Sequence, residues 1–142
     1  MKNTIYHDVI IKADRTKIFK AFTDPKELVH WWPLECSGIP AKGETYNFYF
    51  SDDYDWYGEV ATIKQNEALV IQMVKCEENW LPTQFGFELM ERDKDVVLQF
   101  FHRGWLEMNH EYRKTSYCWA LLLHGLKRYV ENGEILPFQE RA

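Results

Sequence analysis

The amino-acid sequence predicts an α+β fold in which a curved antiparallel sheet wraps around one long C-terminal helix. Three observations carry this prediction. Residues 109–132 contain no proline and have a strong helical period, and a run of short, aromatic-rich strand patterns precedes them. Two short helical patterns also follow a single first strand. An arrangement of this kind often encloses a small molecule between the sheet and the helix.

The length of the chain indicates one domain spanning residues 1–142. A chain of this size buries roughly 70% of the surface that its unfolded form would expose, so a core is expected without disulfides or metals. Aromatic residues make up 16% of the sequence, which is a high share. A bulky core and an aromatic-lined cavity would each account for it.

The first part of the chain predicts one strand and two helices. Apolar and polar residues alternate over residues 5–11, which indicates a half-buried strand. Asp14 is a suitable N-cap for a helix over residues 15–23. A second helix is expected over residues 25–31, because Pro25 fits the first helical position, where its missing N–H would have no partner.

The middle of the chain predicts a series of strands joined by short polar turns. The apolar residues alternate with polar ones in most of these segments, and short connections favour antiparallel neighbours over alternating parallel units. The predicted strands cover residues 45–50, 56–63, 69–74, 85–89 and 96–103.

The last helix is predicted to be amphipathic along its whole length. At about 1.5 Å per residue it would be roughly 35 Å long, enough to cross a sheet. Asn109 is the expected N-cap and Gly133 the expected residue just past the end. Its apolar face, within about 120° of the helical wheel, consists of Tyr112, Thr115, Trp119, Leu122, Leu123, Leu126, Tyr129 and Val130.

Charge and composition exclude several classes of protein. The formal net charge is -5 and the basic residues are scattered, so no nucleic-acid partner is expected. Three widely spaced cysteines do not form a disulfide framework. The N-terminus lacks the apolar core of a signal peptide, and the longest apolar run, residues 118–123, is too short to span a bilayer. We therefore expect a cytoplasmic protein and no integral membrane protein.

Several motifs, in a fixed order along nearly the whole chain, resemble a known family. They are residues 9–13, 18–25 and 31–33, then Gly43 and residues 58–60, then Leu69 and residues 85–89 and 100–105, and finally residues 119–133. This pattern resembles the family of homologues of the activator of the heat-shock-protein-90 ATPase, within the START-like (SRPBCC) helix-grip superfamily. The resemblance implies a helix-grip fold with a cavity between the sheet and the last helix. One departure is Cys118 before Trp119, where the family often has glycine.

The residues expected to contact a ligand come from the inward faces of the predicted strands and helices. Trp32 is included because Pro33 fixes the chain just after it. His102 and His7 fall on the inward faces of the last and first strands, where they could be polar handles or an acid/base pair, or two hydrogen-bonded histidines near strand ends. The predicted ligand-binding residues are Trp32, Phe48, Trp56, Phe87, His102, Tyr112, Trp119 and Leu122.

The sequence contains no pattern typical of a metal site, a nucleophilic elbow or a phosphate-binding loop, so no metal, cofactor or catalytic residue is predicted. The leading hypothesis is a START-like protein that binds a small hydrophobic or amphipathic molecule in this cavity. A co-chaperone-like interaction domain is the alternative, and a cyclase-type or hydrolase-type enzyme is a third. Tyr117, Leu121 and His124 form a stripe that could contact a second copy or a chaperone.

Overall fold

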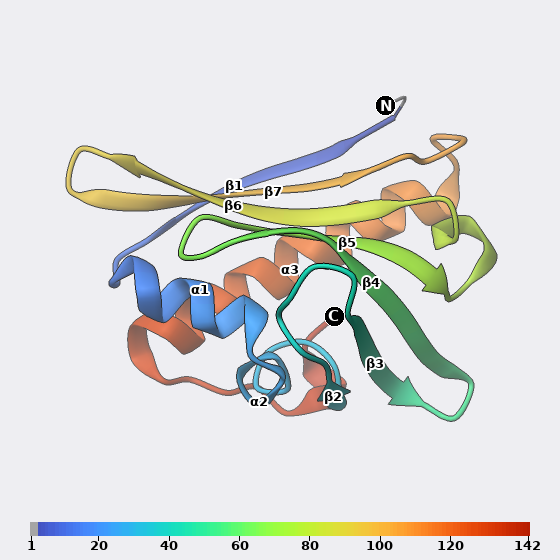
Figure 1. The fold of residues 1–142 in the computed structure, drawn as a ribbon, viewed down its shortest axis with the longest axis horizontal. Coiled ribbons are helices and arrows are strands. Elements are labelled where there is room, and N and C mark those ends of the chain that lie inside the picture. The colour runs from blue at the N-terminus through green and yellow to red at the C-terminus, as the bar shows by residue number, and fades with distance from the viewer. Residues whose placement is uncertain (1–2) are drawn as a thin grey trace.

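The computed structural model describes residues 3–142 and has one seven-stranded sheet with helices on one side of it. The α+β prediction is confirmed, and the sheet curls around the long last helix (Figure 1). The elements are β1 (Ile5–Ile11), α1 (Arg15–Thr23), α2 (Pro25–Leu28), β2 (Glu35–Ser37), β3 (Thr45–Ser51), β4 (Tyr54–Lys64), β5 (Ala68–Lys75), the 3-10 helix η1 (Glu78–Trp80), β6 (Gln84–Arg92), β7 (Asp95–Arg103), α3 (His110–Asn132) and the 3-10 helix η2 (Phe138–Glu140).

All neighbouring strands of the sheet are antiparallel, in the order β1-β7-β6-β5-β4-β3-β2. Strands β3 to β7 therefore form a meander, as their short turns predict. The first strand lies beside the last, with Val9 opposite Leu98. Strands β1 and β2 are the two edges of the sheet, and α1 and α2 carry the chain from one edge to the other across the concave side (Figure 1). The meander from β2 to β7 then brings the chain back beside β1.

Helices α1 and α3 begin after their predicted N-cap residues, and α3 ends at the predicted glycine. The carboxylate of Asp14 accepts from the amide of Thr16, and the side chain of Asn109 accepts from the amide of Tyr112 at 3.1 Å. Gly133 ends α3 with φ 73°, a left-handed conformation that glycine adopts without strain. Within residues 3–142, no helix has the length and the apolar run that a membrane crossing needs.

Two segments differ from the sequence-based prediction. The second helix ends at Leu28 rather than near Trp31, because turns that accept hydrogen bonds at the Leu28 carbonyl carry the chain on to Trp32. The three-residue strand β2, paired with β3, was not predicted. A strand this short has too few residues to show an alternating pattern.

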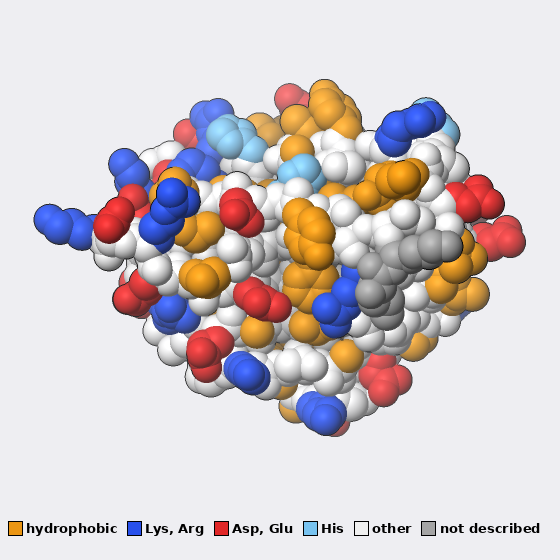
Figure 2. Space-filling view, turned by 90° about the horizontal axis from the view of Figure 1, so that it is seen from above, with side chains coloured by type: hydrophobic (Ala, Val, Ile, Leu, Met, Phe, Trp, Pro, Cys, Tyr) orange, Lys and Arg blue, Asp and Glu red, His pale blue; other side chains and the backbone are white. Residues whose placement is uncertain are grey.

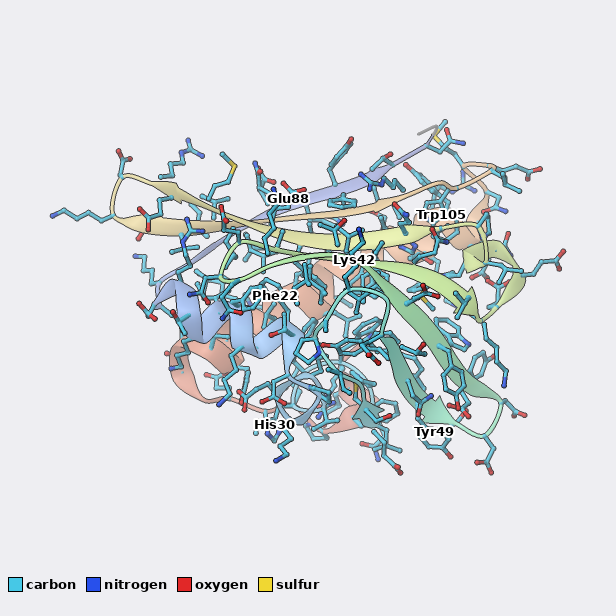
Figure 3. The ribbon with its side chains drawn as sticks, viewed as in Figure 1. Phe22, His30, Lys42, Tyr49, Glu88 and Trp105 are labelled. Carbon is cyan, nitrogen blue, oxygen red and sulfur yellow. The ribbon has the colours of Figure 1, made fainter. Side chains whose placement is uncertain are left out.

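The core lies between the concave face of the sheet and the three helices. Phe22 of α1 stacks on Phe87 of β6 with ring centroids 4.8 Å apart, and the ring of Trp119 of α3 lies 4.3 Å from Phe100 of β7. Figure 3 shows Phe22 on the inner side of the sheet and Glu88 of β6 on the outer side. This arrangement confirms the alternation that predicts an inward-facing aromatic set on the strands.

The outer face of the sheet carries apolar side chains among charged ones (Figure 2). Tyr6 of β1 and Met90 of β6 are exposed there, whereas Phe101 of β7 is buried with the guanidinium of Arg103 4.5 Å above its ring. Scattered apolar groups of this kind are ordinary on a protein surface.

Two glycines allow a matched test of this packing. A Cβ at Gly58 of β4 would lie 2.4 Å from a methyl carbon of the fully buried Ile71. Gly58→Ala should therefore lower the free energy of unfolding by about 1–3 kcal/mol. At Gly125 of α3, a Cβ would meet no heavy atom of residues 3–142 within 4 Å beyond its chain neighbours and the backbone of its own helix. Gly125→Ala should therefore raise the free energy of unfolding by about 0.5–1 kcal/mol. Urea unfolding of both variants measures this, and a Gly58→Ala protein as stable as wild type would contradict the tight contact of β4 with β5.

Candidate functional site

A cavity of about 380 Å³ lies where β3, β4 and η1 approach the first half of α3. Aromatic side chains from four separate parts of the chain form most of its wall, and a few polar side chains lie among them. The lining residues are Trp32, Phe50, Tyr54, Trp56, Glu77, Asn79, Trp80, Glu111, Lys114, Thr115, Cys118, Trp119 and Leu122.

The aromatic wall is held together by ring contacts. Trp56 of β4 and Trp80 of η1 have centroids 4.8 Å apart, and Trp32 lies 4.8 Å from Trp119 of α3. The indole N–H of Trp80 points to the hydroxyl of Thr115 at 3.4 Å, so η1 is tied to α3 as well. These contacts give the wall a fixed shape.

The loop that carries Trp32 is fixed from the C-terminal end of the chain. The guanidinium of Arg141 donates to the carbonyl of Val29 at 2.8 Å and to the carbonyl of Pro33 at 3.3 Å. Partial burial lowers the pKa of this guanidinium from its ordinary value. The backbone after α2 is therefore anchored on both sides of the cavity-lining tryptophan.

A chain of three polar side chains borders the cavity between η1 and α3. The amide of Asn109, the N-cap of α3, donates to the side-chain oxygen of Asn79 at 3.1 Å. The amide of Asn79 in turn donates to Oε1 of Glu77 at 2.8 Å. Glu111 and Lys114, both in the first two turns of α3, complete the charged part of the lining.

Behind the cavity wall, His102 is completely buried and both of its ring nitrogens are occupied. Its Nδ1 accepts from the indole N–H of Trp119 at 3.0 Å, and its Nε2 lies 2.8 Å from the hydroxyl of Thr83. That hydroxyl donates to the carbonyl of Trp80 at 2.6 Å, so Nε2 of the imidazole is the donor to Thr83. Burial lowers the pKa of His102 from 6.5 to about 3, and the imidazole is neutral at physiological pH.

The structure divides the eight predicted ligand-binding residues into two groups. Trp32, Trp56, Trp119 and Leu122 line the cavity. The other four are Phe48, Phe87, His102 and Tyr112, and they lie outside its lining. The first three of these are buried in the core, and the hydroxyl of Tyr112 donates to the carbonyl of Thr4 at 3.2 Å.

The two inward-facing histidines do not share a cavity. His7 lies opposite Phe100 across β1 and β7, and its Nε2 lies 3.0 Å from the carbonyl of Ser116 on α3. The ring of His102 is enclosed instead by the indoles of Trp80, Trp105 and Trp119. These hydrogen bonds support the interpretation of His7 and His102 as two hydrogen-bonded histidines near strand ends. They do not support an acid/base pair in one cavity.

Several lining residues were not predicted from the sequence. Trp80 and Glu77 lie in the segment that reads as a polar turn between β5 and β6. A large aromatic residue inside such a turn, here Trp80 shortly before Pro82, is the signal that could have indicated a buried contact. Cys118, which departs from the family pattern, is half-buried and contributes to the cavity lining.

The exposed stripe on α3 is interrupted by the C-terminal segment. Tyr117 is 67% exposed and Leu121 41% exposed. Leu121 and His124, however, line a second and smaller cavity of about 190 Å³ together with Leu136 and Arg141. Within residues 3–142, no group of three or more His, Cys, Asp or Glu side chains is placed to hold a metal ion.

Comparison with known families agrees with this geometry. The model of the family described as "Activator of Hsp90 ATPase homolog 1-like protein" matches residues 12–131, which include every strand after β1 and nearly all of α3. The chain belongs to this family. The cavity of this Aha1-like chain lies inside the matched range.

Solved structures show the same fold. A protein from Colwellia psychrerythraea, determined in solution as an Aha1 dimer, is 28% identical with a TM-score of 0.85, covering 93% of this chain and 98% of that one. A protein from Mesorhizobium loti is 17% identical with a TM-score of 0.80, covering 94% and 100%. A third, from Staphylococcus saprophyticus, is 17% identical with a TM-score of 0.79, covering 94% and 96%. No curated protein matched the Aha1-like chain.

Proposed function

We propose that this Aha1-like protein binds a small apolar or amphipathic molecule in the cavity between β3, β4, η1 and α3. The observation that carries the proposal is the cavity itself. Its volume of about 380 Å³ falls within the roughly 300–1,000 Å³ that is typical of ligand pockets. Its lining combines many aromatic side chains with a few polar ones, which is the composition such pockets have.

The packing beyond the cavity limits the size of the proposed ligand. Phe48, Phe85 and Phe87 are all fully or almost fully buried, with ring centroids about 6 Å from their neighbours. They fill the part of the sheet–helix interface that lies toward α1. A ligand would therefore occupy one end of that interface, against Trp32, Trp56, Trp119 and Leu122, with its polar group toward η1 and the start of α3.

Native mass spectrometry of the purified protein, followed by extraction of bound compounds, tests the proposal. We expect a bound compound or, for protein that has been stripped, a rise in melting temperature with small aromatic amphiphiles. Ligand binding should also change the fluorescence of the tryptophans in the wall. A protein with no bound compound, no thermal shift and no change in fluorescence across such a set would contradict the proposal.

Self-association is a second candidate, and the specific observation for it is the related protein determined as a dimer. Its contact surface on this chain would include the exposed Tyr117 of α3. Sedimentation equilibrium should then show a dimer that Tyr117→Glu dissociates. A monomer at all concentrations would exclude it. The geometry gives less support to an enzyme, because the buried imidazole of His102 already has a partner at each nitrogen.

A further inference from the structure

We infer that the ligand of this cavity carries a positive charge, such as an ammonium group, next to its apolar body. The inference rests on the function proposed above and concerns the chemical class of the ligand. It is drawn from one carboxylate at the cavity, from the aromatic faces around it and from the balance of charge in the lining.

The carboxylate of Glu77 is held in place before any ligand arrives. Its Oε1 accepts from Asn79, whose own side-chain oxygen accepts from Asn109. Asn109 in turn caps α3 by accepting from the amide of Tyr112. Three hydrogen bonds therefore fix the carboxylate relative to both η1 and α3, so that little conformational entropy would be lost when it meets a cation.

The second oxygen of the same carboxylate has no hydrogen-bond partner among residues 3–142. Oε2 of Glu77 is buried and accepts no hydrogen bond from the residues that the structure describes. None of the ion pairs found within residues 3–142 includes this side chain. A buried carboxylate oxygen without a donor is destabilising. A cationic group in the cavity would stabilise this carboxylate by its charge, whereas an anionic or purely apolar ligand would not.

The aromatic wall favours the same kind of ligand. The faces of tryptophan and tyrosine rings attract cations, and tryptophan does so most strongly. Four tryptophans line this cavity, and two of them, Trp56 and Trp80, have ring centroids 4.8 Å apart. Trp80 belongs to η1, the short helix that begins directly after Glu77. A cation between these rings and the carboxylate would meet negative potential from both.

The charge of the whole lining is also negative. Glu77, Glu111 and Lys114 are its charged residues, two acidic and one basic. Lys114 is exposed, where water and salt screen its charge, and Glu77 is half-buried, where its charge is screened less. The charge of Glu77 should therefore act more strongly on an occupant of the cavity than the charge of Lys114 does.

Three probes of the same shape and different charge test the inference: phenylbutylamine, phenylbutanol and phenylbutyrate. Isothermal titration calorimetry near neutral pH should show the amine binding at least about tenfold more tightly than the alcohol, with the acid weakest. Glu77→Gln keeps the oxygen that accepts from Asn79 and removes the charge. It should bring the affinity for the amine down to that for the alcohol and leave the affinity for the alcohol unchanged.

Glu78→Gln is the matched control, because Glu78 is adjacent, exposed and outside the lining of this cavity. It should keep the preference for the amine. A second variant, Lys114→Gln, should increase that preference about threefold and does not alter the Glu77 network. This second variant keeps the inference testable if Glu77→Gln folds poorly.

The outcomes separate this inference from the proposed function. An alcohol that binds, together with an amine that binds no more tightly, would overturn the inference and leave the binding function standing. A preference for the amine that survives Glu77→Gln in a folded protein would also overturn it. If none of the three probes binds, the proposed function fails and the inference fails with it.

Discussion

Replacement of Cys118 by tryptophan should weaken binding of all three phenylbutyl probes by about 100-fold or more. Cys118 is half-buried on α3 and contributes to the cavity lining, so the larger side chain would occupy the space of the ligand. A loss of this size corresponds to about 2.7 kcal/mol of binding free energy. Because the indole would enter an existing cavity rather than a filled core, the free energy of unfolding should change by less than about 1.5 kcal/mol. Calorimetry and urea unfolding measure the two quantities.

Ala120→Trp is the control for this variant. Ala120 lies two residues further along α3, is exposed and is outside the lining of the candidate site. It should leave binding unchanged. If the Cys118→Trp, Ala120→Trp and wild-type proteins bound the probes with equal affinity, the probes would bind outside the candidate site. A Cys118→Trp protein that does not fold would show instead that this end of the interface is tightly packed.

The largest effect on stability is expected at His102. Its pKa is about 3 in the folded protein and near 6.5 in an unfolded chain. Between these values the unfolded chain binds a proton that the folded protein does not. The stabilisation from the neutral imidazole is therefore complete above pH 6.5 and is lost as the pH falls toward 3, by about 1.4 kcal/mol for each pH unit. At pH 4.5 the loss should be roughly 2–3 kcal/mol.

His102→Gln should remove this pH dependence and also lower stability at neutral pH. The variant disturbs the bonds to Trp119 and Thr83, and we expect a loss of about 2–4 kcal/mol at pH 7. The measurement is urea unfolding of both proteins at pH 7 and pH 4.5. Contacts also lower the pKa values of Glu131 and Glu134, but they do so in both proteins and cancel in the difference. A variant as sensitive to acid as wild type would contradict the assignment.

The helices, the longer strands and the cavity-lining side chains on them were predictable from the sequence. The caps of α1 and α3 follow from Asp14 and Asn109, because a polar side chain before an apolar helical period has one favoured role. Trp119 and Leu122 follow from the helical wheel, and Trp56 follows from strand alternation. These are the positions where the local period alone decides which way a side chain points.

The remaining part of the site depends on contacts between distant residues. Glu77 and Trp80 lie in an irregular segment without a period. Trp80 is held at the cavity by Thr115 of α3, and Glu77 is held through Asn79 by Asn109, the N-cap of α3. The environment of His102 could not be predicted either. Strand alternation places it inward, but its hydrogen bonds depend on Thr83, which lies in a turn 19 residues earlier.

The most direct test of the central claim is to locate a bound probe. In protein with isotope-labelled methyl groups, intermolecular nuclear Overhauser effects from the ring protons of phenylbutylamine report which methyl groups it touches. The candidate site predicts contacts with the methyl groups of Thr115 and Leu122. Contacts with Leu121 and Leu136 in the second cavity, or none with Thr115 and Leu122 at saturating probe, would contradict it.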